Sequence, residues 1–223
     1  KFLPGTIGKY NGKVYSVGLW DAACAIFARK SVLTANNIRI PTLDKPWTKA
    51  EFDAALVTLQ KSGKFEYPID LGLAWKGEWY SYAFGPFLQS HGGDLLNAAG
   101  PKANGTLNGK AGVEFGTWWQ SLFTRKLTPG TSQSGADREA GFIDGKYALQ
   151  WNGNWAALPA LKKWGDDLVF LPAVLTRFPV EGYMEKCETE TLIGARAARP
   201  VRLSTPIMIS GMSFGALSLR AKV

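Results

Sequence analysis

Short apolar runs alternate with helical segments along most of the chain, and this alternation restricts the fold more than any other feature. Strand-like runs rich in aliphatic and aromatic residues occur at 13–19, 69–75, 147–151, 167–171 and 200–210. Segments with helical character lie at 31–36, 49–62, 78–91, 110–126, 136–144 and 154–164. Strands that alternate with helices are typical of layered α/β domains. We therefore expect an α/β fold in which helices cover a sheet.

The clearest helix start lies at Thr48. Thr48 and Glu51 have the spacing of a capping box, in which each side chain accepts a hydrogen bond from a free backbone N–H of the first turn. Apolar residues follow at helical spacing, and Gly63 ends the helix. The helix predicted at 78–91 ends with His91, where a histidine can bond the last carbonyls. We therefore expect a structural role for His91.

Net charge and the counts of His and Cys exclude several kinds of site. The 223 residues include 26 Lys and Arg against 18 Asp and Glu, a net charge of +8, but the basic residues are scattered. A nucleic-acid interface needs clustered basic residues, so we expect none. One His and two Cys permit no His-based zinc pattern, no C-x-x-C motif and at most one disulfide. The sequence predicts no membrane span and no signal peptide within the chain.

The segment Gly211 to Gly215 matches the G-x-S-x-G pattern of a nucleophile elbow. In that elbow the acid and the His follow the Ser, whereas only eight residues follow Gly215 and the one His lies far upstream. We therefore interpret the segment as a Gly-rich turn. No pair of carboxylates stands out as a glycosidase pair either. The sequence thus predicts no catalytic residue.

Tryptophan gives the strongest chemical signal. All nine Trp lie between Trp20 and Trp164, several of them near predicted strand ends. Indole rings bind the C–H faces of sugars, and an aromatic contact contributes ~0.5–1.5 kcal/mol beyond its buried area. Most Trp side chains belong to cores, so we expect roughly two or three to face a ligand. With their polar neighbours, and with Asn152 as a further hydrogen-bonding group, the candidate ligand-binding residues are Trp20, Asp21, Trp75, Trp79, Tyr80, Trp151, Asn154 and Trp155.

Four segments resemble the extracellular solute-binding proteins of ABC importers, the maltose-binding-like family 1. They are PGTIGKYNGKVYSVGL, IPTLDKPWTKAEFDAAL, FLQSHGGDLLN and AGFIDGKYALQWNGNWA, in that order. The last is similar to the family pattern F-x-x-G-K-x-A-x-x-x-x-G-x-W and is the most specific. The resemblance implies that residues 1–165 form the hinge and the C-terminal lobe of a two-lobed, periplasmic-binding-protein-like α/β fold, whose first lobe would precede Lys1.

The same resemblance implies a function. A sugar or oligosaccharide would be held in the cleft between the lobes, residues 13–19 would form a hinge strand, and Trp20, Trp79 and Trp155 would line the cleft. It further implies an ABC transporter permease as partner and a periplasmic or extracellular location. Enzymatic activity, a cofactor and a metal site are not expected for such a protein.

The C-terminal part resembles another family. Residues 166–223, and MSFGALS in particular, are similar to the start of the FMN-binding barrel domain of glutamate synthases. This resemblance implies an incomplete segment of a barrel, with Gly211, Met212 and Ser213 near the flavin. Two alternatives therefore stand beside sugar binding: a fragment of an FMN-dependent glutamate synthase-related oxidoreductase, and a fragment that binds nothing. A domain boundary is expected between residues 165 and 166.

Overall fold

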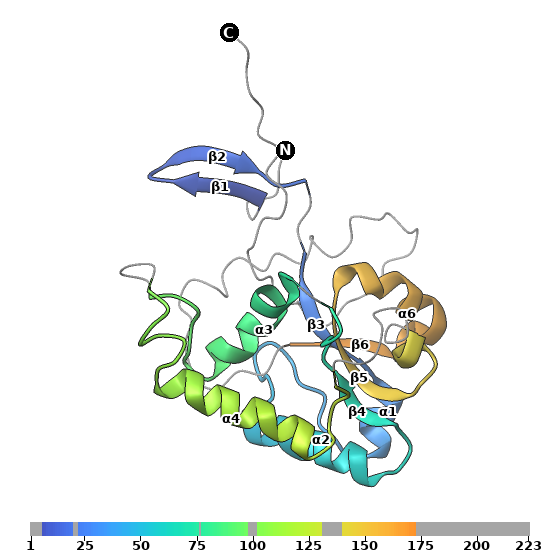
Figure 1. Cartoon of the computed structure of the whole chain (residues 1–223). Coiled ribbons are helices and arrows are strands. Elements are labelled where there is room, and N and C mark those ends of the chain that lie inside the picture. The colour runs from blue at the N-terminus through green and yellow to red at the C-terminus, as the bar shows by residue number, and fades with distance from the viewer. Residues whose placement is uncertain (1–5, 20–21, 76, 98–101, 131–139, 173–223) are drawn as a thin grey trace.

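The computed structural model describes residues 6–19, 22–75, 77–97, 102–130 and 140–172 (Figure 1). In chain order the elements are β1 (Ile7–Tyr10), β2 (Lys13–Val17), β3 (Cys24–Arg29), α1 (Lys30–Ala35), α2 (Lys49–Lys61), β4 (Tyr67–Asp70), α3 (Trp79–Ser90), α4 (Lys110–Thr124), β5 (Tyr147–Gly153), η2 (Asn154–Ala156), α6 (Ala157–Trp164), η3 (Gly165–Asp167) and β6 (Leu168–Leu171). Strands and helices alternate, and the α/β expectation is confirmed.

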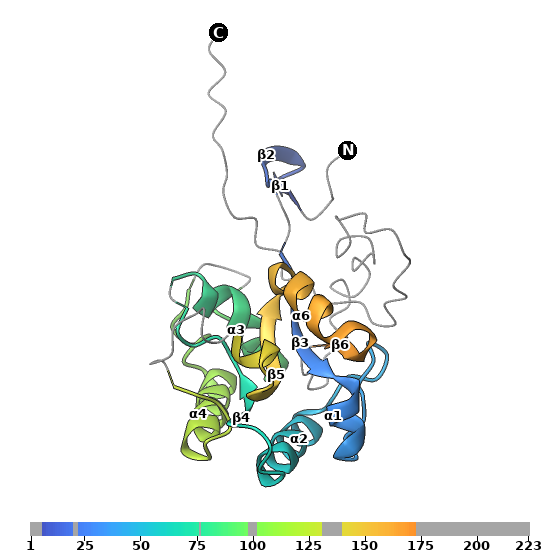
Figure 2. The same cartoon turned by 90° about the vertical axis from the view of Figure 1, so that its right-hand side faces the viewer.

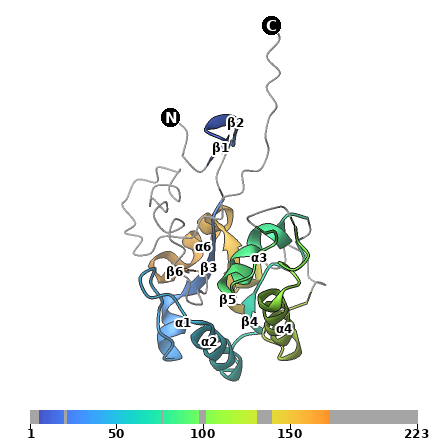
Figure 3. The ribbon, with the colours of Figure 1, turned by 90° about the vertical axis from the view of Figure 1, so that its left-hand side faces the viewer.

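The central sheet has four strands in the order β4-β5-β3-β6. β3 is antiparallel to both β5 and β6, whereas β4 runs parallel to β5. Successive side chains of β3 point to opposite faces, so that Ile26 enters one core cluster and Phe27 the other. Helices α2, α3 and α4 cover one face, and α6 covers the other (Figures 2 and 3). Helices on both faces explain why every residue of β5 and β6 is buried.

The larger core is rich in aromatic rings that fix α3 against the sheet. The ring centroid of Phe87 lies 4.9 Å from that of Trp151 and 6.5 Å from that of Phe52. The indole Nε1 of Trp151 also donates a hydrogen bond of 2.9 Å to the carbonyl of Ala83. β5 and α3 are therefore joined by packing and by a buried hydrogen bond near the carboxyl end of β5.

The capping box of α2 is confirmed. Glu51 N–H donates to Thr48 Oγ1 at 3.2 Å, and Thr48 N–H donates to Glu51 Oε2 at 2.9 Å. The apolar residues that follow at helical spacing are buried as expected: Phe52, Ala55, Leu56 and Leu59. α3 is confirmed as well, with His91 at its C-terminal cap. The Nδ1–H of His91 donates to the Phe87 carbonyl at 2.8 Å, which is the structural role predicted for this side chain.

The prediction of one strand over 69–75 was wrong, because the strand ends at Asp70. The carboxylate Oδ1 of Asp70 accepts a hydrogen bond from Gly72 N–H, and Gly72 adopts φ +79°. Both features belong to a turn. Leu71 and Leu73 nevertheless remain buried, at 1% and 5% exposure. Their burial explains the apolar run that suggested a longer strand.

The predicted strand 13–19 is seen as β2, which pairs with β1 in an antiparallel hairpin. Asn11 and Gly12 form the turn with φ of +47° and +76°. The predicted helix 154–164 starts as the 3-10 turn η2 before α6. Of the predicted helix 136–144, residues 140–143 are helical and 136–139 lie outside the described residues, as does the predicted strand 200–210. β6 follows the boundary expected between 165 and 166 and pairs with β3; the boundary itself stays a prediction.

Candidate ligand-binding site

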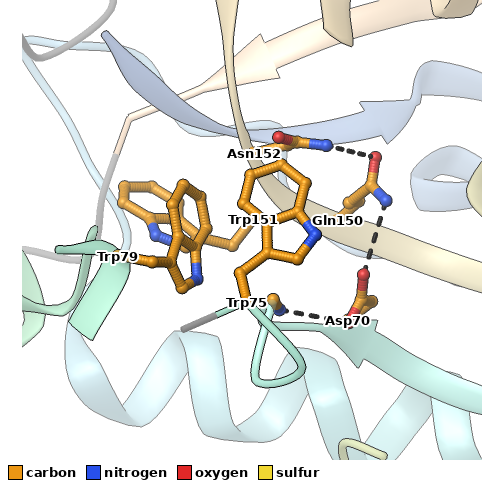
Figure 4. Close-up of a pocket in the computed structure, with 7 residues that line it drawn as sticks. Asp70, Trp75, Trp79, Gln150, Trp151 and Asn152 are labelled. Atoms are coloured by element: carbon orange, nitrogen blue, oxygen red, sulfur yellow. Dashed lines mark hydrogen bonds between the residues drawn. The ribbon is translucent and has the colours of Figure 1, made fainter. Parts of the chain in front are cut away.

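The parallel pair β4–β5 brings two loops together at the edge of the sheet that is formed by the carboxyl ends of these strands. Asp70 and Gln150 are partners in the β4–β5 register, and both strands end within three residues of them. Ligands commonly bind outside the carboxyl ends of parallel strands. A pocket lies at this edge (Figure 4). Its lining residues are Asp70, Gly72, Trp75, Trp79, Gln150, Trp151 and Asn152.

Three polar side chains form the floor of the pocket. Asp70, Gln150 and Asn152 are 1%, 3% and 3% exposed. Gln150 Nε2 donates to Asp70 Oδ2 at 3.4 Å, and Asn152 Nδ2 donates to Gln150 Oε1 at 3.3 Å. The ends of this row accept from backbone: Gly72 N–H bonds Asp70 Oδ1 at 3.1 Å, and Gly153 N–H bonds Asn152 Oδ1 at 2.8 Å. These bonds compensate the cost of burying polar groups.

Indole rings form the wall. The Trp75 centroid lies 4.6 Å from that of Trp79, edge to face, and 5.8 Å from that of Trp155 at an interplanar angle of 30°. Trp155 is 44% exposed, whereas Trp79 is 4% exposed and Trp151 only 1% exposed. Trp155 and the half-buried Trp75 are therefore the indoles of this cluster that keep ring surface accessible to solvent. Of the two buried indoles, Trp79 packs edge to face on both Trp75 and Trp155.

Each flanking loop has a glycine in contact with an indole. The Trp79 ring packs on Gly72, where a Cβ would lie 2.5 Å from the indole Nε1. The same Nε1 donates to the Leu71 carbonyl at 3.4 Å. The ring of Trp155 packs on Gly153 in the same way, and a Cβ there would overlap it. Both indoles thus lie directly against the backbone of their loops.

The pocket combines flat aromatic surface with amide and carboxylate groups. Such a set can stack against an apolar ring face and exchange hydrogen bonds with hydroxyl groups. The side chains fill it almost completely, and no water-sized space is enclosed between them. Pockets that enclose a ligand measure roughly 300–1,000 Å³. The residues seen here therefore do not by themselves enclose a ligand of sugar size.

The structure brings together some of the residues predicted for the site. Trp75, Trp79 and Trp151 line the pocket, and Trp155 contacts the first two of these rings. Tyr80 does not line it, is 45% exposed and donates its hydroxyl to the Leu73 carbonyl at 2.9 Å. Asn154 is also absent from the lining, and its backbone N–H donates to the Ala23 carbonyl. Trp20, Asp21, Gly211, Met212 and Ser213 lie outside the described residues.

Asp70, Gly72 and Gln150 belong to the pocket but were not predicted. Gln150 and Asn152 are two apart on β5 and so share one face of the strand. A polar pair at this spacing in an otherwise apolar strand is a signal for a polar floor. Asp70 is a charged residue directly followed by an apolar run with a glycine, which is a signal for a strand end.

Burial shifts the pKa values of two titratable side chains, Cys24 and His91. Burial raises the pKa of the Cys24 thiol to about 12, which leaves almost no thiolate at neutral pH. Burial also lowers the pKa of His91, at the end of α3. Among the residues that the structure describes, no three His, Cys, Asp or Glu are grouped to hold a metal ion. Within the same ranges, no helix has the length and apolarity of a membrane crossing.

Solved structures with the same fold come from several bacteria. The GacH receptor of Streptomyces glaucescens, studied unliganded and with acarbose, is 24% identical with a TM-score of 0.60, over 78% of this chain and 43% of that one. Maltose-bound MalE3 of T. maritima is 22% identical with a TM-score of 0.61, over 78% and 44%. A sugar transporter protein of Arthrobacter chlorophenolicus A6 with bound laminaribiose is 18% identical with a TM-score of 0.58, over 78% and 42%. At these identities the likeness shows the fold, and the chain spans less than half of each structure's length.

A curated relative matches a short segment. The glutamate synthase large subunit-like protein of Rhizobium meliloti (strain 1021) is 57% identical over 58 residues, which are 26% of this chain and 13% of the relative. The resemblance of part of the chain to glutamate synthase is therefore confirmed.

The sequence also matches the model of a protein family over most of its length. The bacterial extracellular solute-binding protein family is matched by residues 1–196. The α/β sheet, its helical layers and the neighbours above agree with that match. The chain belongs to the bacterial extracellular solute-binding proteins.

Proposed function

We propose that this chain is the substrate-binding component of an ABC importer and that it binds a sugar or oligosaccharide without catalysing a reaction. The observation that carries the proposal is the pocket at the carboxyl ends of β4 and β5, where the half-buried Trp75 and the neighbouring, exposed Trp155 lie beside buried hydrogen-bonding groups. Structures of the same fold hold maltose and laminaribiose. These ligands are neutral and rich in hydroxyl groups, which the pocket's chemistry suits.

The ligand ring would stack on Trp155 and Trp75. Trp155 is the more exposed of the two, and the small angle between the rings makes a broad apolar surface. Each aromatic contact contributes ~0.5–1.5 kcal/mol beyond area burial. The amide of Asn152 and the other polar groups of the pocket floor would exchange hydrogen bonds with the hydroxyl groups of the sugar. Stacking and hydrogen bonding together would favour sugars over purely apolar molecules.

A second wall would complete the site. The pocket is smaller than a site that encloses a ligand, so a sugar on this wall would stay open to water on its other side. In the family that the chain belongs to, closure of two lobes around a hinge supplies that cover. We propose the same for the whole protein, with an ABC permease as partner, a periplasmic or extracellular location and no cofactor.

The proposal is tested by titrating the 223-residue chain with maltose and laminaribiose. Saturation-transfer NMR detects the weak, millimolar complexes that a single wall would give, and intrinsic fluorescence reports on the indoles. We expect saturation transfer to the C–H protons of at least one sugar. Trp155→Ala should weaken that binding by about tenfold, because it removes the most exposed stacking surface. Trp164→Ala is the matched control, since Trp164 packs on Arg29 at the end of α6 and not in the pocket.

The two variants also define the contradictory result. Absence of saturation transfer for both sugars, with no change in fluorescence, would overturn sugar binding by this chain. Equal losses in the Trp155 and Trp164 variants would show that the pocket is not where the sugar binds.

A second candidate function rests on the short match to a glutamate synthase large subunit-like protein. We propose as this alternative that residues 166–223 bind FMN through Gly211, Met212 and Ser213, which lie outside the described residues. The purified chain would then carry a flavin absorption band, or would quench the fluorescence of added FMN. A colourless protein that leaves FMN fluorescence unchanged contradicts this alternative.

A further inference from the structure

The two loops beside the pocket have the same construction. In the first loop, Asp70 ends β4 and accepts the N–H of Gly72, and the buried Trp79 ring covers that glycine. Since Trp79 also packs edge to face on Trp75, the loop geometry determines where the Trp75 ring lies. A polar anchor and a covered glycine therefore set the first indole pair.

The second loop repeats this arrangement on β5. Asn152 accepts the N–H of Gly153, and the Trp155 ring covers Gly153. Gln150 stands between the two anchors. Its amide bonds Asp70 on one side and Asn152 on the other. A continuous row of buried hydrogen bonds thus connects the loop of Trp75 to the loop of Trp155.

The donors and acceptors of this row of hydrogen bonds can be arranged in one order only, and the backbone groups at its ends determine that order. A backbone N–H can only donate, so Asn152 must turn its oxygen to Gly153 and its NH₂ to Gln150. Gln150 then presents its oxygen to Asn152 and its NH₂ to Asp70, where an ionised carboxylate can only accept. Each side chain has the orientation that its neighbour requires.

We propose that Asp70, Gln150 and Asn152 form a directional hydrogen-bond relay that holds the Trp155 ring at its place relative to Trp75. In this role they are positioning residues for ligand binding. The effect of the relay on ligand binding rests on the function proposed above. Its effect on the arrangement of the indoles does not, because the relay holds the rings in the protein without ligand.

Reversal of one member should disturb the whole row. In Asp70→Asn, the oxygen of the new amide is needed by Gly72 N–H, so its NH₂ faces the NH₂ of Gln150. Two donors cannot bond. If the Gln150 amide rotated to turn its oxygen to position 70, its NH₂ would face the NH₂ of Asn152 instead. The double variant Asp70→Asn/Gln150→Glu again places a donor opposite an acceptor at both contacts of position 150, because the new carboxylate there accepts from both sides.

The experiment compares these two variants with wild type and with Asp53→Asn. Asp53 forms an ion pair of 2.8 Å with Arg125 outside the pocket and controls for loss of a charged hydrogen-bond acceptor. Near-UV circular dichroism of the ligand-free chain reads the geometry of the closely spaced indoles, and acrylamide quenching reads the exposure of Trp155. Maltose and laminaribiose titrations by saturation-transfer NMR give the affinity.

We expect Asp70→Asn to change the near-UV spectrum and to weaken sugar binding roughly three- to tenfold, the loss of about one hydrogen bond. The double variant should return both readouts to wild type, and Asp53→Asn should change neither. A double variant as altered as Asp70→Asn would overturn the relay, because a residue that serves only as a charge or a packing group is not rescued in this way. An unchanged Asp70→Asn spectrum would overturn it too.

Asn152→Ala gives a second route should Asp70→Asn fail to fold. It removes the anchor of Gly153 together with the bond to Gln150, and it leaves the bond between Asp70 and Gly72 in place. The relay therefore requires increased quenching of Trp155, and unaltered quenching overturns it. The spectroscopic results stand even where no sugar binds the wild-type chain. Failure of the proposed function is therefore distinguishable from failure of the relay.

Discussion

At the residue scale, Gly72 is constrained both by its left-handed backbone and by the indole packed against it, whereas Gly77 is constrained by its backbone alone. Both glycines have positive φ, +79° and +73°. A Cβ at Gly72 would lie 2.5 Å from the buried Trp79 indole, whereas the space around Gly77 is open. Comparison of the two positions therefore distinguishes backbone strain from lack of room for a side chain.

Gly77→Ala should lower the free energy of unfolding by about 1–2 kcal/mol, through the left-handed backbone alone. Gly72→Ala should cost about 1–3 kcal/mol more, because Trp79 must also move. Urea unfolding monitored by far-UV circular dichroism measures both. Equal losses in the two variants would show that the Trp79 ring gives way without cost.

His91 links stability to pH. Burial lowers its pKa, the hydrogen bond to the Phe87 carbonyl raises it, Lys49 lowers it and Glu114 raises it, in order of size. The net result is a pKa below the ordinary value of 6.5. The ring is therefore held neutral, with its Nδ1–H bonded and its Nε2 buried.

The folded protein binds this proton less tightly than the unfolded chain does. The contribution of His91 is thus fully present above the unfolded pKa near 6.5 and is lost as pH falls through the lower folded pKa. We expect Tm to fall between pH 7.5 and 5.5 in wild type and to fall less in His91→Gln. Calorimetry at the two pH values measures the difference. Parallel curves for the two proteins would refute the linkage.

At the element scale, the start of α2 has a defined contribution. Thr48→Ala removes the side-chain acceptor for Glu51 N–H and should lower the free energy of unfolding by about 1 kcal/mol. Thr48→Ser keeps the hydroxyl and serves as the control. Urea midpoints at constant m-value measure both variants. A Thr48→Ser variant as unstable as Thr48→Ala would assign the loss to the methyl group instead of the cap.

Local signals explain which elements could be predicted from the sequence. The capping box and the spacing from Phe52 to Leu59 act within one turn or two, and α2 was found from them. The end of β4 depends on a contact from Asp70 to Gly72, while Leu71 and Leu73 are buried by tertiary packing that looks like a strand in the sequence. Asn11-Gly12 is a hairpin signal, and its use would have identified β1.

The candidate site was only partly predictable for a related reason. Trp75, Trp79 and Trp155 are conspicuous as residue types near strand ends, so composition and position indicated them. The floor pairs Asp70 with Gln150, eighty residues away along the chain. Their contact follows from the parallel register of β4 and β5, which no local pattern in the sequence specifies.

At the scale of the whole molecule, the β1–β2 hairpin and the four-stranded sheet differ in burial. Every residue of the hairpin is half-buried or exposed, and Tyr10 and Tyr15 are 70% and 69% exposed. All residues of β3 except Arg29 are buried. Figure 1 shows the hairpin apart from the layered body. An isolated two-stranded hairpin is marginal in water, so its hydrogen bonds should open easily.

Hydrogen exchange followed by mass spectrometry should resolve this difference. Peptides from β1 and β2 should exchange at least about tenfold faster than peptides from β3 and β5. β4, a strand at the edge of the larger sheet, provides the control for edge position alone. Protection of the hairpin equal to that of β3 would contradict the expectation and would indicate that further contacts cover it.

The central place of β3 has a consequence for synthesis on the ribosome. Phe27 pairs with Gln150 and with Phe170, so the strand at the middle of the sheet waits for partners made more than 120 residues later. Ribosomes add roughly 5–20 residues per second, which leaves the apolar strand without its neighbours for many seconds. During that interval the emerging chain offers Ile26 and Phe27 to any binding protein that recognises extended apolar segments. The strand order of the sheet thus sets a delay of many seconds between the synthesis of β3 and its burial between β5 and β6.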